Sequence, residues 1–398
     1  MWYKSSAVIP CAEETVGAMS DAVVNPMKAG LEDVVVSPSD ICFIDGHKGR
    51  LLYRGYDVDD LVAQSTFEEV TYLLWYGALP TRKELDVHVK ALSSTANRKL
   101  PPKLVSMLRL FPKKTTPMEI LRTGMSALSA WDPDAADNSR EATLRKSIRL
   151  TAQMPTLVAA WDRIRRGKPP VAPNPKLSLA GNFVYMMSGK KATPLATKTF
   201  DVALILHADH EFNASTFAAR VTAATLSDIH SAVVSGIGAL KGPLHGGANE
   251  QVMLMVEKIK DPAKADRWIR QALADKARIM GFGHRVYRVE DPRAKHLKRL
   301  ALELGRQAGS TANVEILDIM ARVVGAEKKI FPNVDLYSGA AYASMGIATD
   351  EFTPIFAMSR VAGWAAHVLE QHGNNRLIRP RSDYTGLTDE KYVPLAER

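Results

Sequence analysis

His245 lies in a stretch, Gly242–Glu250, that is too rich in glycine and proline for a regular helix or strand. Apolar residues recur with helical spacing after this stretch, so we expect a helix that Asn249 caps. His245 would then precede a helix N-terminus, where free amide groups and the helix dipole favour a neutral imidazole and can hold an anion. A glycine-rich connector with an incidental histidine is the alternative interpretation.

Two more histidines, His207 and His210, stand three residues apart in the segment His207–Thr216. At the end of an expected helix, this spacing would place both side chains on one face. A metal-dependent hydrolase would need a third ligand there, but Asp209 and Glu211 would point away from that face. We therefore expect no metal site. A pair of histidines that bind nearby carbonyl groups stays open as an alternative.

A third cluster combines glycines with basic side chains. Gly281 and Gly283 would let the backbone approach a ligand closely. The hydrogen-bond donors that follow are His284, Arg285, Arg288 and Arg293. The spacings of dinucleotide-binding and Walker phosphate loops are absent. The cluster could still bind a phosphorylated carrier, or it could be a solvated basic loop.

Asp335 stands among apolar residues at the start of an expected helix, where it could be an N-cap or a general base. Arg360 interrupts an apolar helix, and Arg379 lies in a polar tail. A buried arginine needs an anionic partner, and a small di- or tricarboxylate would bind to it in bidentate fashion. Together, the histidines, the aspartate and the arginines suit a metal-free reaction between anionic substrates. Such a reaction would involve proton transfer and an oxyanion that develops in the transition state.

The elements that must position these side chains are mostly helices. Two short strands around a glycine-containing turn, within Ile41–Arg54, are nearly the only β signal. Helix starts are indicated by capping-box patterns at Thr66 and Thr81 and by Thr116 followed by proline. The other helices are expected over 141–166 with an interruption at Pro155, from Phe200 through His210, over 215–240, and near 263–279, 292–308, 313–325, 335–346 and 352–372. We expect about 15 to 20 helices in total, with an irregular tail over 373–398.

Composition narrows the class of protein. The chain has 398 residues, of which 46% are hydrophobic and 24% are charged, as in ordinary globular proteins. The net charge of +9 comes from scattered residues without a nucleic-acid motif, so we expect no nucleic-acid partner. Cys11 and Cys42 are far apart, which excludes a disulfide framework. Neither a signal peptide nor a membrane span is indicated, so we predict a cytoplasmic protein.

Seven motifs resemble the citrate synthase family, in the order in which they occur. They are HADHEFNAST (207–216), GPLHGGANE (242–250), GFGHRVY (281–287), DPR (291–293), PNVDLYSG (332–339), MSRVAGWAAH (358–367) and NNRLIRPRSDY (374–384). The resemblance runs from about Leu31 to the C-terminus, and several of the motifs are nearly identical to those of the family.

The resemblance implies an all-α, two-domain, multi-helical fold with a short N-terminal β-hairpin. Residues 1–34 would form an arm, and 35–246 with 352–398 would form a large helical domain. Residues 247–351 would form a smaller, mobile CoA-binding domain that closes over oxaloacetate before acetyl-CoA reacts. It also implies a homodimer with shared active sites, and the short N-terminal region predicts no control by NADH.

The resemblance also implies the roles of individual residues. Asp335 would remove a methyl proton of acetyl-CoA, His245 would hold the enol oxygen, and His284 would polarise the oxaloacetate carbonyl and protonate the new alkoxide. The carboxylates would be held by His210, Arg293, Arg360 and, from the partner subunit, Arg379. CoA would be held by Met280, Gly281, Phe282, Gly283 and Arg288. No cofactor would be bound permanently, because CoA is a co-substrate.

The activity implied is that of an acyltransferase that makes citrate from acetyl-CoA and oxaloacetate and begins the tricarboxylic acid cycle. The alternative is 2-methylcitrate synthase, which uses propionyl-CoA. Arg285 after the third histidine and the intact HADHE motif favour citrate synthase. One methylene in a pocket discriminates by only about 1–3 kcal/mol, so use of both substrates stays open. A non-catalytic acyl-CoA-binding protein is disfavoured because all three expected catalytic residues are present.

Overall fold

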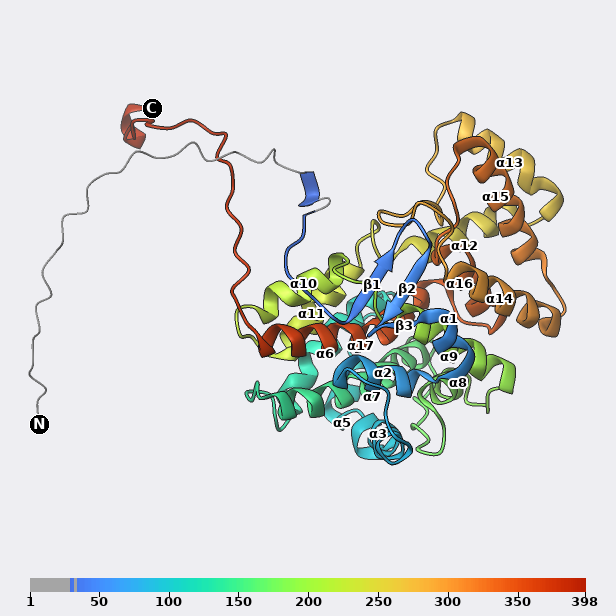
Figure 1. The fold of residues 1–398 in the computed structure, drawn as a ribbon, viewed down its shortest axis with the longest axis horizontal. Coiled ribbons are helices and arrows are strands. Elements are labelled where there is room, and N and C mark those ends of the chain that lie inside the picture. The colour runs from blue at the N-terminus through green and yellow to red at the C-terminus, as the bar shows by residue number, and fades with distance from the viewer. Residues whose placement is uncertain (1–28, 32–33) are drawn as a thin grey trace, which may run out of the picture. The chain divides into compact units, whose positions relative to one another are not determined.

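The computed structural model describes residues 29–31 and 34–398, so most of the arm predicted over 1–34 lies outside the described residues. The chain divides into the units Met1–Ser39 and Asp40–Arg398. The described part of the first unit contains the short 3-10 helix η1 (Ala29–Leu31). The second unit contains three strands and the helices α1 to α17 (Figure 1). The predicted mainly helical fold is confirmed.

The predicted hairpin is present, with one strand more than expected. Strand β1 (Cys42–Asp45) pairs in antiparallel fashion with β2 (Arg50–Tyr53), which also pairs with β3 (Tyr56–Asp57). Cys42, Ile44, Leu51 and Tyr53 are buried. The hydroxyl oxygen of Tyr53 lies 3.1 Å from the carbonyl oxygens of both Ile205 and Asp209, so its proton can be donated to either. The hairpin therefore packs against the end of a later helix.

Most of the predicted helix starts are confirmed by their capping interactions. Thr81 and Thr116 each form a complete capping box, the latter with proline at the first helical position. Thr66 accepts from the backbone N–H of Glu69, but the Glu69 carboxylate binds Ser65 instead, so that box is incomplete. The helices in this part are α1 (Val58–Gln64), α2 (Phe67–Tyr76), α3 (Arg82–Ser93), α4 (Thr95–Arg98), α5 (Pro102–Leu108) and α6 (Pro117–Leu128).

The predicted interruption at Pro155 is wrong. Helix α7 (Arg140–Arg165) runs through this proline without ending. Proline removes one intrahelical hydrogen bond, but its ring and the neighbouring side chains of Met154 and Leu157 are buried. Packing against α6, α8 (Leu179–Ser188) and the last helix thus outweighs the local preference.

Two further helix boundaries differ from expectation. Helix α9 (Pro194–His207) ends three residues before the predicted end at His210. The single helix predicted over 215–240 is a pair, α10 (Ala214–Ala223) and α11 (Ile229–Leu240). The chain turns between them at Leu226, whose φ is 63°, and the Asp228 side chain caps α11 by accepting from Ser231 N–H. Local capping thus divides a continuous apolar pattern.

The later helices follow the prediction closely. They are α12 (Ala248–Ile259), α13 (Pro262–Ala274), α14 (Ala294–Ala308), α15 (Ala312–Lys328), α16 (Asp335–Ser344) and α17 (Phe352–Gly373). The predicted cap is wrong, because α12 begins before Asn249, which is buried in the first turn. Beyond α17 the chain is irregular apart from the 3-10 turn η4 (Leu395–Glu397), as predicted.

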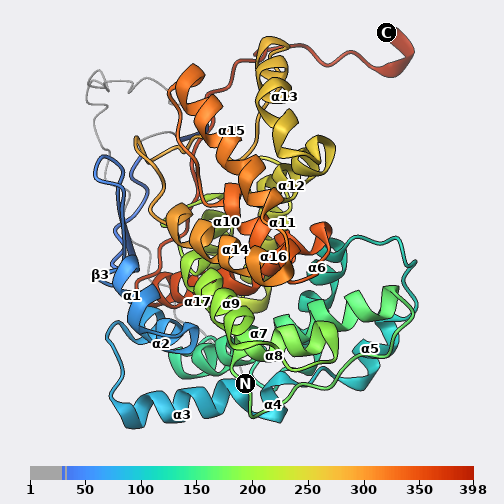
Figure 2. The ribbon, with the colours of Figure 1, turned by 90° about the vertical axis from the view of Figure 1, so that its right-hand side faces the viewer.

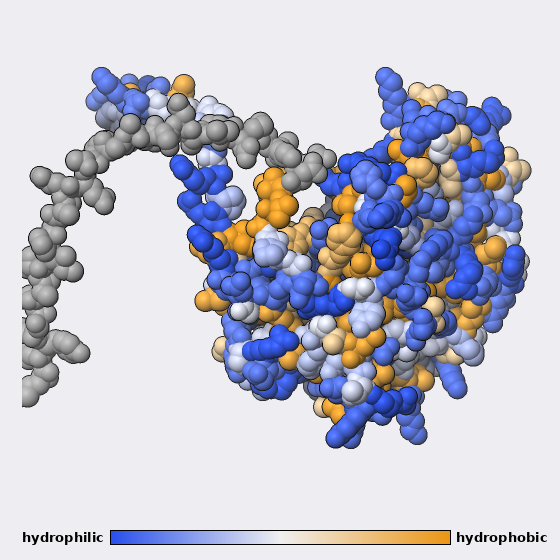
Figure 3. Space-filling view, in the orientation of Figure 1, coloured by the Kyte–Doolittle hydropathy of each residue, from blue (hydrophilic) through white to orange (hydrophobic). Residues whose placement is uncertain are grey.

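Helix α17 is the central element of the second unit. It is buried along most of its length and packs against α2, α7, α9, α10 and α11. In Figures 1 and 2, the paired helices α13 and α15 lie at one end of this unit and α3 lies at the other. Hydrophilic residues cover most of the face of this unit seen in Figure 3. No helix in the described part of the chain is long and apolar enough to cross a membrane.

Two buried carboxylates join α2, α8 and α9. Asp201 on α9 accepts from the N–H of Phe67, the first residue of α2, at 3.1 Å. Glu68 on α2 accepts from the N–H of Leu179, the first residue of α8, at 2.7 Å. Each carboxylate therefore satisfies an unpaired amide at a helix N-terminus. Burial, with the nearby charge of Glu68, raises the pKa of Asp201 to about 7.

This raised pKa predicts that Asp201→Asn stabilises the protein more at pH 8 than at pH 5. The asparagine oxygen can still accept from Phe67. The folded-state pKa of Asp201 lies above its unfolded-state value, so its contribution to stability is full at low pH and is lost as the pH rises towards 7. The gain from the variant should grow by roughly 2 kcal/mol between the two pH values, as measured by urea unfolding. The exposed control Asp60→Asn should show no such growth, and an equal gain at both pH values would refute the prediction.

Candidate active site

Six of the predicted acid–base and carboxylate-binding residues come from five segments of the chain, because His284 and Arg293 share one connection. His210 follows α9, His245 precedes α12, and His284 lies in the long connection between α13 and α14. Asp335 is the first residue of α16, Arg293 directly precedes α14, and Arg360 lies on α17. The positive charges of Arg293 and Arg360 act on His210 and on Asp335. The structure thus brings six of the seven residues predicted for catalysis or carboxylate binding into one cluster.

The backbone fixes the proton position on His284. Its Nδ1 accepts hydrogen bonds from the N–H groups of Val286 at 3.0 Å and Tyr287 at 3.1 Å. Because a backbone N–H can only donate, Nδ1 is unprotonated and the ring proton resides on Nε2. Burial, followed by the charge of Arg293, lowers the pKa of His284 to about 4. His284 is therefore a neutral imidazole that can donate from Nε2.

His245 has the opposite tautomer. Its Nε2 accepts from the backbone N–H of Ser215 at 3.3 Å and lies 2.8 Å from the Ser215 hydroxyl. The indole N–H of Trp364 donates to this hydroxyl at 3.2 Å. Burial, followed by the charge of Arg360, lowers the pKa of His245 to about 4. A neutral His245 therefore carries its proton on Nδ1 and can donate from that atom.

His207 and His210 do not form a metal-binding pair. Helix α9 ends at His207, whose Nδ1 bonds to the carbonyl of Ala203 at 2.8 Å. His210 lies beyond the helix, with Nε2 3.3 Å from the Tyr287 hydroxyl and its ring centroid 4.9 Å from that of His284. The predicted shared face is therefore wrong. Among the described residues, no group of three or more histidine, cysteine or carboxylate side chains is placed to hold a metal.

Arg293 is held by a buried ion pair. Its Nε and Nη2 donate to the two oxygens of Asp291 at 2.9 and 2.7 Å, and both residues are at most 3% exposed. Burial raises the pKa of Asp291, but the guanidinium outweighs this effect, so the net pKa is lowered. Asp291 also accepts from the N–H of Val334, which directly precedes Asp335. One carboxylate therefore positions a basic side chain and the start of α16.

Arg360 has an unused donor in the interior. Its Nε donates to the carbonyl of His207 at 2.8 Å, and its guanidinium carbon lies 4.8 Å from the centroid of the Phe356 ring. Its Nη1 is buried and has no hydrogen-bond partner among the described residues. Burial lowers the pKa of Arg360 to about 10, so the side chain remains a cation at neutral pH. An anionic ligand would satisfy this donor.

Asp335 is a buried carboxylate with an unused acceptor. Its backbone N–H donates to Asn333 Oδ1 at 3.0 Å, while its own Oδ1 has no partner in the described part of the chain. Burial raises the pKa of Asp335, and the charges of Arg293 and Arg360 only partly oppose this, leaving it at about 7. The side chain is thus poised to exchange a proton near neutral pH.

The predicted CoA segment is attached to the same helix start. Gly281 and Gly283 have φ values of 88° and 76°, which glycine adopts most readily. Asn333 Nδ2 donates to the carbonyl of Gly283, and Asn333 N–H donates to that of Gly281, both at 3.0 Å. Met280 and Phe282 are half-buried, and Arg288 is exposed. Arg379 is exposed in the irregular tail, and no hydrogen bond joins it to the cluster among the described residues.

Several residues that contact the cluster were missed because their partners are distant in sequence. Ser215 and Tyr287 act through hydrogen bonds to His245 and His210, which no local pattern indicates. Asn333 links two segments that lie about fifty residues apart. For Asp291 there was a usable signal, because a carboxylate two residues before a candidate arginine is a natural ion-pair partner.

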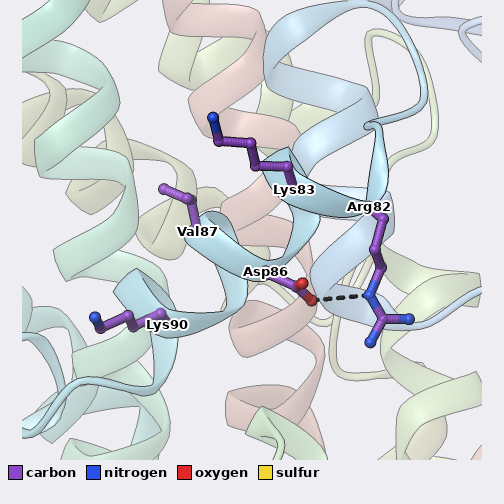
Figure 4. A pocket seen from close by; sticks show the side chains of 5 residues that line it. All are labelled: Arg82, Lys83, Asp86, Val87 and Lys90. Carbon is purple, nitrogen blue, oxygen red and sulfur yellow. Dashed lines mark hydrogen bonds and ion pairs between the residues drawn. The ribbon is translucent and has the colours of Figure 1, made fainter.

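A hollow on the molecular surface lies outside this cluster. It is lined by one exposed face of α3, with the residues Arg82, Lys83, Asp86, Val87 and Lys90 (Figure 4). Arg82 Nε donates to Asp86 at 3.0 Å, as expected for a helical pair four residues apart. All these side chains come from a single helix, and none is a predicted site residue. The buried cluster therefore remains the candidate active site.

The fold and the cluster together define a mainly helical enzyme that performs acid–base chemistry on small carboxylates. The family model described as "Citrate synthase, C-terminal domain" matches residues 30–381. The chain belongs to the citrate synthase family.

Curated relatives carry two different names. Citrate synthase 2 of Bacillus subtilis is 49% identical over 370 residues, which are 93% of this chain and 98% of that protein. 2-Methylcitrate synthase of Mycobacterium tuberculosis is 45% identical over 360 residues, which are 90% of this chain and 91% of that protein. Citrate synthase 2 is the more similar of these two relatives, so the comparison supports citrate synthase over 2-methylcitrate synthase.

Solved structures share the whole architecture. Citrate synthase from Pyrobaculum aerophilum matches with a TM-score of 0.87 and 42% identity, covering 97% of this chain and 98% of that one. The ternary complex of carboxymethyl coenzyme A and oxaloacetate with citrate synthase from Thermoplasma acidophilum matches with a TM-score of 0.86 and 36% identity, covering 93% and 98%.

The buried ion pair predicts that Asp291→Ala lowers the free energy of unfolding by about 3–5 kcal/mol, because it leaves the Arg293 charge buried without its partner. Urea unfolding measures the difference. In the matched control Asp266→Ala, the lost partners are the exposed side chains of Arg270 on α13 and Arg322 on α15, and the stability should change little. Equal effects of the two substitutions would contradict the prediction.

Proposed function

We propose that this chain condenses acetyl-CoA with oxaloacetate and hydrolyses the resulting citryl thioester to citrate and CoA. The observation that carries the proposal is the pair of neutral imidazoles, His245 and His284, whose tautomers are fixed by backbone amides, in the same cluster as the buried Asp335. We further propose that the reaction is the first step of the tricarboxylic acid cycle. A cytoplasmic location stays a prediction from the sequence.

The first step is removal of a methyl proton from the thioester by Asp335. A pKa of about 7 lets this carboxylate be ionised at neutral pH and still be a useful base. The thioester proton is too weakly acidic for a carboxylate unless the enolate is stabilised as it forms. Nδ1–H of His245 supplies that hydrogen bond in a site shielded from water, where a fixed donor contributes several kcal/mol.

In the second step, the new carbon–carbon bond forms between the acetyl carbon and the oxaloacetate carbonyl carbon. Nε2–H of His284 donates to the carbonyl oxygen and transfers its proton to the alkoxide as the bond forms. In the third step, water attacks the citryl thioester and gives a proton to the imidazolate of His284, which restores the neutral ring. The carbon–sulfur bond breaks, the sulfur takes the proton that Asp335 removed from the methyl group, and CoA leaves as the thiol. The new carboxylic acid then ionises to citrate. Low pKa values keep both imidazoles neutral, so each ring has a single N–H group that is free to donate to the substrate.

Oxaloacetate would be held by the side chains that surround these donors. The unpartnered Nη1 of Arg360 supports a carboxylate contact, and Arg293 is held rigidly by Asp291 for another. His210 would complete the contacts on this chain. We propose that Arg379 reaches the site from a second copy of the chain in a homodimer, because it is exposed on the tail of its own chain.

CoA would bind along the segment formed by Met280, Gly281, Phe282 and Gly283, with Arg288 near a phosphate. Hydrogen bonds through Asn333 connect this segment to Asp335. A movement of the segment when CoA binds would therefore also move the base. We propose that 247–351 moves as the smaller domain, since α12 to α16 pack mainly on one another. Closure of this domain would exclude water from the cluster.

The first experiment compares acetyl-CoA and propionyl-CoA, with oxaloacetate, by release of the CoA thiol. We expect kcat/KM for acetyl-CoA to be higher by about 10-fold or more, as one methylene in a pocket allows. A higher value for propionyl-CoA would move the assignment to 2-methylcitrate synthase with the same mechanism. If neither substrate leads to CoA release, a binding protein of this fold would be favoured.

The variant Asp335→Ala should lower kcat by about a thousandfold, because the general base is lost. Oxaloacetate binding should persist in calorimetry, since the arginines remain. The control Asp266→Ala, on the exposed side of α13, should keep normal turnover. Full activity of Asp335→Ala would refute the role assigned to this carboxylate.

A further inference from the structure

The turn of the β-hairpin touches the loop that carries His284. The carbonyl of Gly46 accepts from the N–H of Arg288 at 2.8 Å. A Cβ atom at residue 46 would overlap the carbonyl oxygen of Val286 and lie 2.9 Å from its carbonyl carbon. Only a hydrogen atom fits in this space. Gly49, in the same turn, also lies close to this loop. A Cβ atom at residue 49 would lie 2.9 Å from the side chain of Val289.

Gly46 is required by this contact rather than by its own backbone. Its φ lies outside the left-handed region that favours glycine, whereas that of Gly49 is 62°. An alanine could therefore adopt the backbone conformation of Gly46. The obstacle is the main chain of Val286, which cannot move aside like a flexible side chain.

The main chain of Val286 and Tyr287 determines the state of His284. Both N–H groups donate to Nδ1 and keep the proton on Nε2, the atom that faces the reaction in the proposed mechanism. Tyr287 also contacts His210 through its hydroxyl. A displacement of Val286 by a few tenths of an ångström or more would therefore change the direction of the donor that polarises the carbonyl.

We propose that Gly46 is a positioning residue for His284: the hairpin turn is a rigid surface against which the loop 284–290 packs, and this contact aims Nε2–H at the substrate carbonyl. The inference rests on the proposed function, because it assigns Gly46 an effect only through His284. Gly46 itself touches no substrate. The hairpin, which the mechanism otherwise leaves without a role, thus becomes part of the catalytic apparatus.

The test is Gly46→Ala in the full chain, with His47→Ala as the matched control. His47 is exposed in the same turn. We expect kcat for CoA release to fall by about 10- to 100-fold in Gly46→Ala, as a misplacement of about 1 Å can cause, with the thermal unfolding midpoint close to that of the wild type. His47→Ala should keep both values.

A second readout separates positioning from a general disturbance. Exchange of acetyl-CoA methyl protons with deuterated water, in the presence of an oxaloacetate analogue without a keto group, requires Asp335 and His245 but no carbonyl polarisation. This exchange should stay within about threefold of the wild-type rate in Gly46→Ala. In the His284→Ala background, Gly46→Ala should cause no further loss of turnover.

Three outcomes would overturn the inference. They are an unchanged kcat, an equal fall in methyl exchange and condensation, and a variant too unstable to assay, which would place the role of Gly46 in folding. Failure of the proposed function looks different, because the wild-type protein would then release no CoA from acetyl-CoA or propionyl-CoA in the presence of oxaloacetate. The two failures are therefore distinguishable.

Discussion

The buried ion pair between Asp291 and Arg293 is the interaction on which the active site depends. An unpaired guanidinium in the interior would be strongly unfavourable, so the two side chains must remain together. The same carboxylate accepts from Val334 N–H and thereby sets where α16 and Asp335 begin. Its charge also acts on His284. One anion thus fixes the relative positions of Arg293 and of Asp335, the proposed base.

Burial determines the protonation of the whole cluster. Removal from water disfavours every charged form, so it raises the pKa of Asp335 and lowers those of His245 and His284. The nearby arginines strengthen the effect on the imidazoles. Backbone N–H groups donate to one nitrogen of each imidazole, so the proton of His245 and of His284 lies on the other nitrogen. Desolvation and local hydrogen bonding, rather than any unusual residue, thus produce a carboxylate with a raised pKa and two neutral imidazoles.

The helix starts and the hairpin were predictable because they depend on local interactions. Thr81 with Glu84 and Thr116 with Pro117 indicate their helices at short range. Pro155 misled the prediction because burial against other helices outweighs one missing hydrogen bond. Asn249 misled it because the N-cap of α12 is Gly247, two residues earlier, so that the helix begins at Ala248. In both cases tertiary packing decided between choices that are close in local energy.

The sequence by itself determined which residue types are available, and the motifs around His245, His284 and Asp335 identified the family and the chemistry. Only the tertiary structure decided how they meet. Asp291 contacts Val334, Ser215 contacts His245, and Gly46 contacts Arg288. Each of these contacts joins distant segments through a backbone group, which no local sequence pattern indicates. The protonation states were likewise decided by the fold, because desolvation depends on all the neighbours that surround a group in space.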